Sequence, residues 1–541
     1  MIVDLNESPP EPSHFDICII GAGVAGITIA LELSKSNLKV ALLEGGGTAY
    51  STESQDLYKG FNIGKDYYSA DTSRIRFLGG TSNHWGGNCR ELQELDFKFR
   101  EWVPNSGWPI TKAELVKYYE KAADYCQIGN RGEFLASLES NDVAKIPKRS
   151  DEAKLFVTQY APKTRDADSF KALSFGEAYR DKLGDCKNVT VYLNANVLRI
   201  NESFNSNKIE SVSVINFKEK AYSFRADNFV LAAGGIENAR LLLVSNGKHQ
   251  AGLGNSSDCV GRYFMEHLSI TLGHLVPSKK NLDYYDIYDR PTRRISKPSQ
   301  DAIRKKAYLT FSESLLRKRK IGNTSVSIKR YHLPPSHRTA GYKSAKEFVT
   351  NILNGQAPAE FHFHLRNVLT GIDDVVDGLY WKYFEHDRPI PLYRVSVQTE
   401  QVPNSESRVV LSGEIDKFGV PKASLDWRLT EIDIRTIRDT ALLAAREFGV
   451  ADEGRMVITL PESDEDLANE IYGDWHHMGT TRMSDNAETG VVDKNCKVHD
   501  NDNLFIAGSS VFPTGGHSVP TLTIVALAAR LANHLGALYD N

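Results

Sequence analysis

The chain has 541 residues, which is too many for one ordinary hydrophobic core, so we expect two or more domains. Hydrophobic residues make up 41% and charged residues 25% of the sequence, a composition typical of globular proteins and not of disordered or fibrous chains. The net charge of −4 gives no overall basic footprint, so nucleic acid is not expected as a partner.

Targeting and metal signals are absent from the sequence pattern. Residues 1–14 form a polar tail without the basic start and apolar centre of a signal peptide. The longest apolar run, 519–532, is too short to span a membrane and contains Arg530. Six scattered cysteines form no C-x-x-C pair, which indicates reduced thiols and no metal site. We therefore expect a cytoplasmic protein with no transmembrane segment.

The first strong motif spans residues 15–44. A short apolar run at 16–20 predicts a buried parallel strand, a helical pattern follows at 24–34, and a second apolar strand ends in Glu44. Between the first strand and the helix lies G-x-G-x-x-G, formed by Gly21, Gly23 and Gly26. This order predicts a Rossmann-like dinucleotide site, with the phosphates at the helix N-terminus and Glu44 accepting from ribose hydroxyls.

Several further elements follow in chain order. A glycine-rich loop covers 78–92, and residues 96–185 are predicted to be mostly helical. Period-two alternation predicts strands over 188–229 and again over 390–427, and a helix is expected at 431–448.

Two features in the middle of the chain invite a functional interpretation. An excess of Lys and Arg over 277–345 is interpreted as a solvated insertion, with an anionic partner surface as the alternative. His362 and His364 alternate as they would on one face of a strand, but without further ligands we interpret them as structural.

The C-terminal region carries the remaining signals. The motif WHHMGTTRM spans 475–483, and a buried strand with small residues after it covers 503–516. A nearly all-apolar helix then begins at Pro520. The free backbone N–H groups of Thr521 and Leu522 face an electron-rich acceptor in this interpretation, such as the N1 and C2 carbonyl of a reduced flavin.

Together these motifs resemble those of the glucose–methanol–choline (GMC) oxidoreductases, and the resemblance covers nearly the whole chain. It is carried by GAGVAG with Glu44, GGTSNHWGG, VGRYFMEHL, H-x-x-G-T and PTLTIVALAARLA, in that order. The pattern is most similar to the pyranose-oxidase-like branch and to bacterial sugar dehydrogenases. The resemblance implies an α/β fold in which a Rossmann-like FAD domain is interleaved with a substrate domain built on a large antiparallel sheet.

The resemblance also implies a division of the chain and a set of cofactor contacts. The FAD domain would take residues 15–95, 186–275 and 465–541, and the substrate domain residues 96–185 and 276–464. His84 matches the histidine that is joined covalently to the flavin in pyranose oxidase; a loop histidine that contacts FAD without a bond is the alternative. The implied cofactor-binding residues are Gly21, Gly23, Gly26, Glu44, Gly79, Gly80, Thr81, Asn83, His84, Trp85, Gly86, Gly87, Val197, Gly508, Thr521 and Leu522.

Alcohol oxidation requires a base to take the hydroxyl proton, and histidine is suited to this because its pKa lies near neutrality. The family pattern places the base at His476, while His477 is expected to pack behind it. The family's second polar residue is replaced here by Val519. If the chain before Pro520 is extended, His517 shares a face with Val519 and could supply the missing polar group.

The sequence thus predicts an FAD-dependent oxidoreductase that oxidises the CH–OH group of a small-molecule alcohol, with a sugar or glycoside favoured by the resemblance. Two alternatives stay open: a non-redox lyase that keeps FAD as a structural element, and a catalytically silent flavin-binding partner protein. The electron acceptor, whether oxygen, a quinone or a protein, is not indicated by the sequence.

Overall fold

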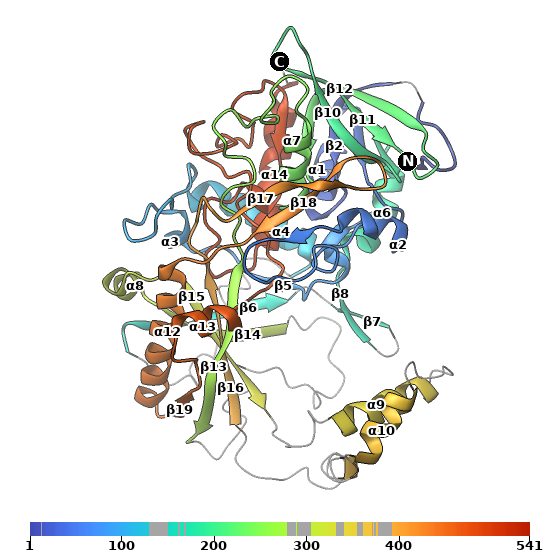
Figure 1. The fold of residues 1–541 in the computed structure, drawn as a ribbon. Coiled ribbons are helices and arrows are strands. Elements are labelled where there is room, and N and C mark those ends of the chain that lie inside the picture. Colours follow the sequence, from blue (N-terminus) through green and yellow to red (C-terminus); the bar gives the residue numbers. More distant parts are fainter. Residues whose placement is uncertain are drawn as a thin grey trace.

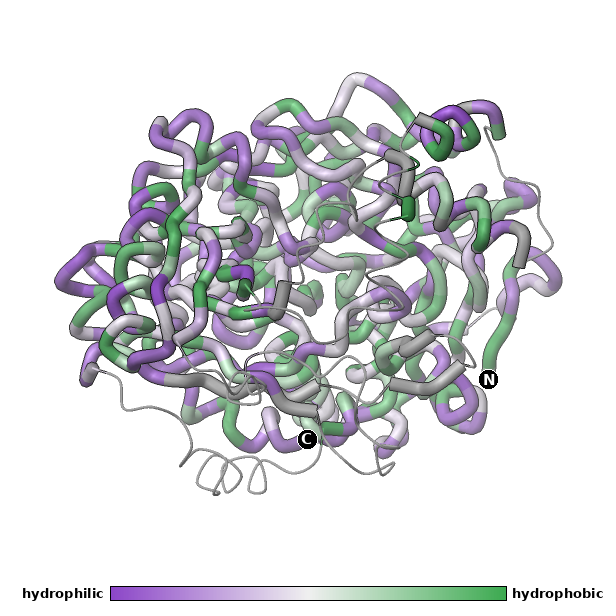
Figure 2. Tube along the Cα trace, turned by 90° about the horizontal axis from the view of Figure 1, so that it is seen from below, coloured by the Kyte–Doolittle hydropathy of each residue, from purple (hydrophilic) through white to green (hydrophobic). Residues whose placement is uncertain are grey.

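The computed structural model describes residues 1–11, 13–128, 150–160, 163–166, 169–278, 288, 304–331, 340–353, 361–370, 372, 375–376 and 392–540. Two large sheets dominate it, one in the upper and one in the lower half of Figure 1, and both chain ends lie in the upper half. In Figure 2 hydrophilic residues mark many of the outer turns of the trace. In the described part of the chain, no helix has both the length and the apolar character needed to cross a membrane.

The first sheet has eight strands in the order β1-β9-β3-β2-β12-β11-β10, with β21 also paired to β12. Its strands are β1 (Ile2–Asp4), β2 (His14–Ile20), β3 (Val40–Leu43), β9 (Val189–Leu193), β10 (Asn196–Glu202), β11 (Ile209–Ile215), β12 (Ala221–Leu231) and β21 (Leu504–Ile506). The strands from β1 through β12 and β21 are parallel, whereas β12, β11 and β10 are antiparallel. β3 is buried along its whole length, as expected for a strand covered on both faces.

The second sheet also has eight strands, in the order β19-β13-β16-β15-β14-β6-β5, with β20 paired to β13, and every pairing in it is antiparallel. Its strands are β5 (Asn88–Cys89), β6 (Ala153–Tyr160), β13 (His267–Pro277), β14 (Arg304–Phe311), β15 (Thr324–Tyr331), β16 (Leu392–Glu400), β19 (Gly454–Ile458) and β20 (Tyr472–Gly473). The Rossmann-like sheet and this large antiparallel sheet confirm the predicted fold class.

Smaller pieces complete the described fold. β17 (Arg408–Ile415), β18 (Pro421–Asp426) and β4 (Phe61–Asn62) form a three-stranded sheet, and β7 (Lys163–Asp166) pairs with β8 (Ser169–Ala172). The helices are α1 (Val24–Leu33), α2 (Thr52–Gln55), α3 (Glu94–Phe97), α4 (Lys112–Cys126), α6 (Phe175–Asp185), α7 (Glu237–Val244), α8 (Glu313–Arg319), α9 (Ala340–Leu353), α10 (Phe361–Thr370), α12 (Glu431–Val450), α13 (Asp464–Glu470) and α14 (Thr521–Ala537). Helix α14 packs against both α1 and α4 beside the first sheet.

The order of elements agrees with the sequence in most places. Strands β9 to β12 and β16 to β18 confirm the strands predicted over 188–229 and 390–427, and α12 confirms the helix expected at 431–448. Two predictions were wrong. Residues 153–160, 163–166 and 169–172 form strands β6, β7 and β8 within a segment predicted to be helical. Residues 361–370 form helix α10, so His362 and His364 do not lie on a strand.

The predicted domain division stays a prediction, but the sheets show where its boundaries cross. The second sheet receives β13 from His267 onwards, although 186–275 was assigned to the FAD domain. Conversely, β5 at 88–89 joins the second sheet from within the segment 15–95. The chain thus passes between the two sheets earlier than the motifs indicated, and the two crossing points lie beside the cleft described next.

Candidate active site

A cleft with a volume of about 450 Å³ runs from the carboxyl end of β2 to the loop before β21. Its lining comes from the G-x-G-x-x-G turn, the glycine-rich loop, the end of β12, the two adjacent histidines and the start of α14. Segments far apart in the sequence therefore meet here, at the carboxyl ends of parallel strands, which is where doubly wound sheets bind ligands.

Of the glycines in the turn between β2 and α1, only the second has room for a side chain. A Cβ on Gly21 would lie 2.6 Å from the carbonyl oxygen of Ala232, and a Cβ on Gly26 would lie 1.9 Å from the carbonyl oxygen of Gly21. Gly23, in contrast, lines the cleft and has open space where its Cβ would stand. It is also the N-cap of α1 without a side-chain cap, so the helix presents uncapped N–H groups to the cleft. These are features that a pyrophosphate group requires.

Glu44 lies at the end of β3 with 6% of its surface exposed. Its carboxylate accepts from the backbone N–H of Ala22 at 3.1 Å and of Gly46 at 2.9 Å. Burial raises the pKa of Glu44, while these N–H groups and the charge of Arg76 act in the opposite direction. The carboxylate faces the cleft with acceptor capacity left for ribose hydroxyls.

The glycine-rich loop contains residues with two different placements. Gly80, Thr81, His84, Trp85 and Gly86 line the cleft. Gly79, Asn83 and Gly87 do not line it, and their contact with the cofactor stays a prediction.

Asn83 and Gly79 have structural roles in the glycine-rich loop. The Asn83 amide donates to the carbonyl oxygens of Leu78 at 3.1 Å and Gly80 at 2.8 Å, which closes the turn from behind. Gly79 has φ +96°, and a Cβ there would lie 2.5 Å from the backbone nitrogen of Gly176. These contacts shape the loop.

His84 lines the cleft and has one ring nitrogen without a hydrogen-bond partner among the described residues. Its half-buried ring lies 5.2 Å from that of Trp475, with 32° between the planes. Its Nε2 atom is buried and, within the part of the chain that the structure describes, has no hydrogen-bond partner. Burial lowers the pKa of the His84 ring, which favours the neutral form. A buried nitrogen without a partner indicates a missing ligand atom and not a finished core.

The other predicted contacts divide in the same way. Val197, Gly508 and Thr521 line the cleft, whereas Gly26 and Leu522 do not. Leu522 points into the core beside α14 with 4% exposure, and Gly26 packs against the turn. Helix α14 begins at Thr521, with Pro520 as its N-cap and not as its first helical residue.

The two adjacent histidines differ in their surroundings. His476 lines the cleft and is half-buried, and its Nδ1 lies 2.8 Å from Nδ1 of His267 at the start of β13. Nε2 of His477 lies 2.9 Å from the hydroxyl of Tyr67, and that hydroxyl also donates to the Glu266 carboxylate. His477 also lines the cleft, but its Nε2 is already engaged by the Tyr67 hydroxyl.

Glu266 anchors the backbone that carries these histidines. Its carboxylate is fully buried and accepts from the backbone N–H of His476 at 2.9 Å and of Asp474 at 3.2 Å. Burial raises the pKa of Glu266 to about 8, although the Tyr67 hydroxyl and the His476 N–H partly oppose this. Tyr67, Glu266 and His267 were not predicted as site residues. The motif VGRYFMEHL contained two of them, but its spacing does not indicate that β13 begins against the histidine loop.

His517 does not reach the cleft. Its side chain is fully buried, its Nδ1 lies 3.4 Å from the Arg90 guanidinium, and its carbonyl oxygen accepts from the same group at 2.8 Å. The expectation that His517 shares a face with Val519 fails because residues 516–518 form a turn and a bend, beginning at Gly516 with φ +55°, instead of an extended segment. Val519 itself does line the cleft, with 6% exposure, as an apolar wall.

Comparison with known families agrees with this geometry. A family model described as GMC oxidoreductase matches residues 403–528, and one described as FAD dependent oxidoreductase matches residues 16–254. The chain is 24% identical to 2-methyl-1,2-propanediol dehydrogenase of Mycolicibacterium austroafricanum over 97% of this chain and 96% of that protein. It is 22% identical to the fructose dehydrogenase large subunit of Gluconobacter japonicus, over 97% and 98% respectively.

Two solved structures show the same fold. A formate oxidase variant from Aspergillus oryzae RIB40 aligns with a TM-score of 0.58 and 18% identity, over 98% of this chain and 99% of that one. Pyridoxine 4-oxidase from Mesorbium loti aligns with a TM-score of 0.54 and 18% identity, over 96% and 99%. Among the described residues, no group of three or more His, Cys, Asp or Glu side chains is arranged to hold a metal ion.

Proposed function

Because the chain belongs to the GMC oxidoreductase family and is an FAD-dependent oxidoreductase, we propose that it oxidises the CH–OH group of a sugar or related alcohol with His476 as the general base. FAD, when bound, supplies the acceptor for the hydride that leaves the carbon. The observation that carries the proposal is the position of His476, a cleft-lining imidazole in the same cleft as the dinucleotide cradle.

The cradle fits FAD on the residues present. Gly21, Gly23 and the N-terminus of α1 would hold the pyrophosphate, Glu44 a ribose, and the backbone of Val197 the adenine. Val197 suits this because a register shift between Val197 and Arg199 leaves the β10–β11 ladder irregular at that point. Thr521 and the start of α14 would face the electron-rich edge of the flavin.

His476 would take the hydroxyl proton while its surroundings keep it unprotonated beforehand. Burial lowers the pKa of His476 to about 3, and the positive charge of Arg90 acts in the same direction. The Glu266 carboxylate accepts from the backbone N–H of His476 and not from its ring. This contact positions the residue without an ion pair that would favour the protonated imidazolium. These features keep the His476 ring unprotonated throughout the neutral range.

The preference for a sugar is supported by the aromatic surface near the base. Trp475 lines the cleft with 38% of its surface exposed, and Tyr68 packs edge-on against it at 5.5 Å. Exposed aromatic rings beside polar groups suit a ligand with both C–H and hydroxyl faces. The relatives named above also act on hydroxyl compounds by their names. The cytoplasmic location predicted from the sequence stays a prediction.

An assay with an artificial electron acceptor tests the proposal. The holoenzyme is incubated with sugars, glycosides and simple alcohols, and the carbonyl product is identified by mass spectrometry. We expect acceptor reduction and a product two hydrogens lighter with at least one sugar. Products that differ from the substrate by bond cleavage without oxidation would support the lyase alternative instead.

The pH dependence follows from the state of His476. A base whose pKa is lowered from 6.5 to about 3 stays unprotonated as the pH falls through 6.5, so the rate of flavin reduction is retained there and is lost only as the pH approaches the lowered value. We expect the reduction rate constant to be constant from about pH 8 to about pH 5.5. Stopped-flow measurement over this range checks it; an acid limb centred near 6.5 would show that the ring titrates as an ordinary histidine.

We also propose that His84 carries the flavin covalently, because this residue lines the cleft and its buried Nε2 has no hydrogen-bond partner among the described residues. Acid precipitation of the purified protein should leave the yellow colour in the pellet, and a flavin peptide containing His84 should appear after digestion. His84→Ala should release free FAD under the same treatment. A colourless pellet from the parent protein would show that FAD is bound without the link.

A further inference from the structure

The hydrogen bonds of His267 determine which nitrogen of His476 carries a proton. Nε2 of His267 lies 2.9 Å from the carbonyl oxygen of Gly516, and a carbonyl can only accept, so this Nε2 carries the hydrogen. His267 is fully buried, which lowers its pKa to about 3 and keeps the ring neutral. A neutral imidazole has one N–H, so Nδ1 of His267 is an acceptor.

The same logic extends to His476. Its Nδ1 lies 2.8 Å from Nδ1 of His267, and a hydrogen bond between these atoms requires a hydrogen on one of them. Since His267 has none at Nδ1, His476 must donate from Nδ1. The neutral His476 ring then has a bare Nε2, and no other residue that the structure describes bonds to that atom.

Buried groups hold both ends of the hydrogen-bonded chain that runs from His476 through His267 to the carbonyl of Gly516. At one end, the Glu266 carboxylate holds the backbone N–H of His476 and, at 3.1 Å, that of His267. At the other end, a Cβ on Gly516 would lie 2.4 Å from the carboxyl carbon of Asp96, so the turn that presents the accepting carbonyl is tightly packed.

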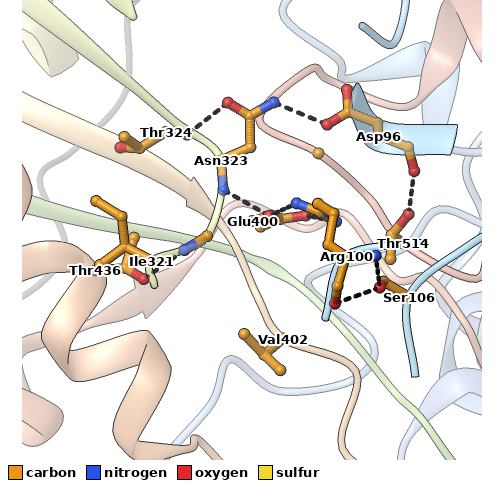
Figure 3. Close-up of polar contacts among 12 residues, drawn as sticks. Asp96, Arg100, Ser106, Ile321, Asn323, Thr324, Glu400, Val402, Thr436 and Thr514 are labelled. Atoms are coloured by element: carbon orange, nitrogen blue, oxygen red, sulfur yellow. Dashed lines mark hydrogen bonds and ion pairs between the residues drawn. The ribbon is translucent and has the colours of Figure 1, made fainter. Parts of the chain in front are cut away.

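The Asp96 carboxylate is in turn held by the buried cluster of Figure 3. It accepts from the Asn323 amide at 2.8 Å, and the Asp96 carbonyl accepts from the Thr514 hydroxyl at 2.7 Å. Neither the carbonyl of Gly516 nor the backbone of His476 can therefore shift to accommodate a different pattern of hydrogen bonds.

We propose that His267 is a positioning residue that holds His476 as the Nδ1–H tautomer, so that Nε2 is the atom that receives the substrate's hydroxyl proton. In that step the O–H bond breaks and an Nε2–H bond forms, while the hydride leaves with its electron pair as described above. His476 becomes an imidazolium whose Nδ1–H still donates to neutral His267. The inference rests on the proposed function only for the identity of the proton donor.

The charged groups around the hydrogen-bonded chain act in opposite directions. Arg90 disfavours a second proton on either ring, whereas Asp474, which lines the cleft, favours it on His267. Asp474 is itself held by Ser269 at 2.5 Å and Gln398 at 2.7 Å. A tautomer set by hydrogen bonds, and not by a charge on His267, is consistent with this balance.

Two variants separate positioning from packing. In His267→Asn the amide oxygen can stand near the place of Nδ1 and still accept from His476. In His267→Gln the amide stands near the place of Nε2 and can still donate to Gly516, but no acceptor remains beside His476. We expect His267→Asn to reduce its flavin within about tenfold of the parent rate and His267→Gln to lose about 10²-fold or more. Equal rates, or a faster Gln variant, would overturn the proposal.

A second readout does not depend on any substrate. The holoenzyme is labelled with ¹⁵N-histidine, and the ring signals of His476 are assigned by their loss in His476→Ala. The proposal predicts a protonated Nδ1 and a bare Nε2 in the parent and in His267→Asn. A protonated Nε2 in the parent would overturn it even if the enzyme oxidises alcohols. If the ¹⁵N signals are as predicted but no alcohol is oxidised, the tautomer assignment stands and the proposed function fails.

Discussion

Replacing His476 with alanine will slow flavin reduction by about 10²–10⁴-fold, the usual contribution of a positioned acid–base group. The protein should remain yellow, because the dinucleotide cradle is formed by the β2–α1 turn and Glu44 and not by this side chain. His476 lines the cleft as a neutral ring, whereas Nε2 of the neighbouring His477 is already bonded to the Tyr67 hydroxyl. Anaerobic stopped-flow reduction measures the rate.

His477→Ala is the matched control. Nε2 of this ring is engaged by the Tyr67 hydroxyl and is not available to a substrate, so its loss should cost less than the loss of His476. If the two effects are reversed, His477 and not His476 is the base. The tautomer that His267 imposes on His476 would then have no role in catalysis.

The second large effect concerns stability. Arg100→Leu should lower the free energy of unfolding by about 3–5 kcal/mol, because it leaves the Glu400 carboxylate buried without its ion-pair partner. The two side chains are 1% and 0% exposed, and one of their hydrogen bonds measures 2.9 Å. Figure 3 shows how this pair joins Asn323 and Asp96 in one network. Urea unfolding followed by tryptophan and flavin fluorescence measures the loss.

An exposed ion pair provides the comparison. Lys98 and Glu313 lie 3.2 Å apart with side chains 47% and 39% exposed, so Lys98→Ala should cost about 0–1 kcal/mol. Combining Arg100→Met with Glu400→Leu should recover much of the loss, because no unpaired charge then remains buried. A loss of equal size for Arg100→Leu and Lys98→Ala would contradict the assignment of Arg100 and Glu400 as a buried structural pair.

The Rossmann-like half could be predicted because its signals are local. The strand, the three glycines, the helix and Glu44 occur within thirty residues, and each has a physical requirement that few other residues meet. The antiparallel sheet came from the family resemblance and not from its strands. Its strand β6 was missed in a segment predicted to be helical, because its partner β14 is about 150 residues away.

Alternation misled the prediction twice. The pattern of His362 and His364 suits a strand, but Phe361, Leu365 and Leu369 recur at the spacing of a helix face, and the segment is helix α10. The proposed role of His517 assumed an extended chain up to Pro520. Gly516 instead takes a left-handed conformation against Asp96, and that turn sends His517 into the core.

The contact between His476 and His267 could not be predicted from the sequence for a different reason. His476 and His267 are 209 residues apart, and their contact depends on where β13 starts and how Glu266 holds the histidine loop. The motif around His267 was recognised, but a sequence motif does not show which hydrogen bonds its histidine makes, and these bonds determine the tautomer of His476. The buried pair of Arg100 and Glu400, separated by 300 residues, left no local signal at all.

Anaerobic mixing of the holoenzyme with a panel of sugars, glycosides and simple alcohols, without any added electron acceptor, tests the central claim most directly. The account predicts that at least one sugar or alcohol bleaches the visible absorbance of the flavin completely, yields one carbonyl product per flavin, and does so about 10²–10⁴-fold more slowly in His476→Ala. An oxidised flavin spectrum that no alcohol in the panel changes, in a protein that retains its FAD, would contradict it.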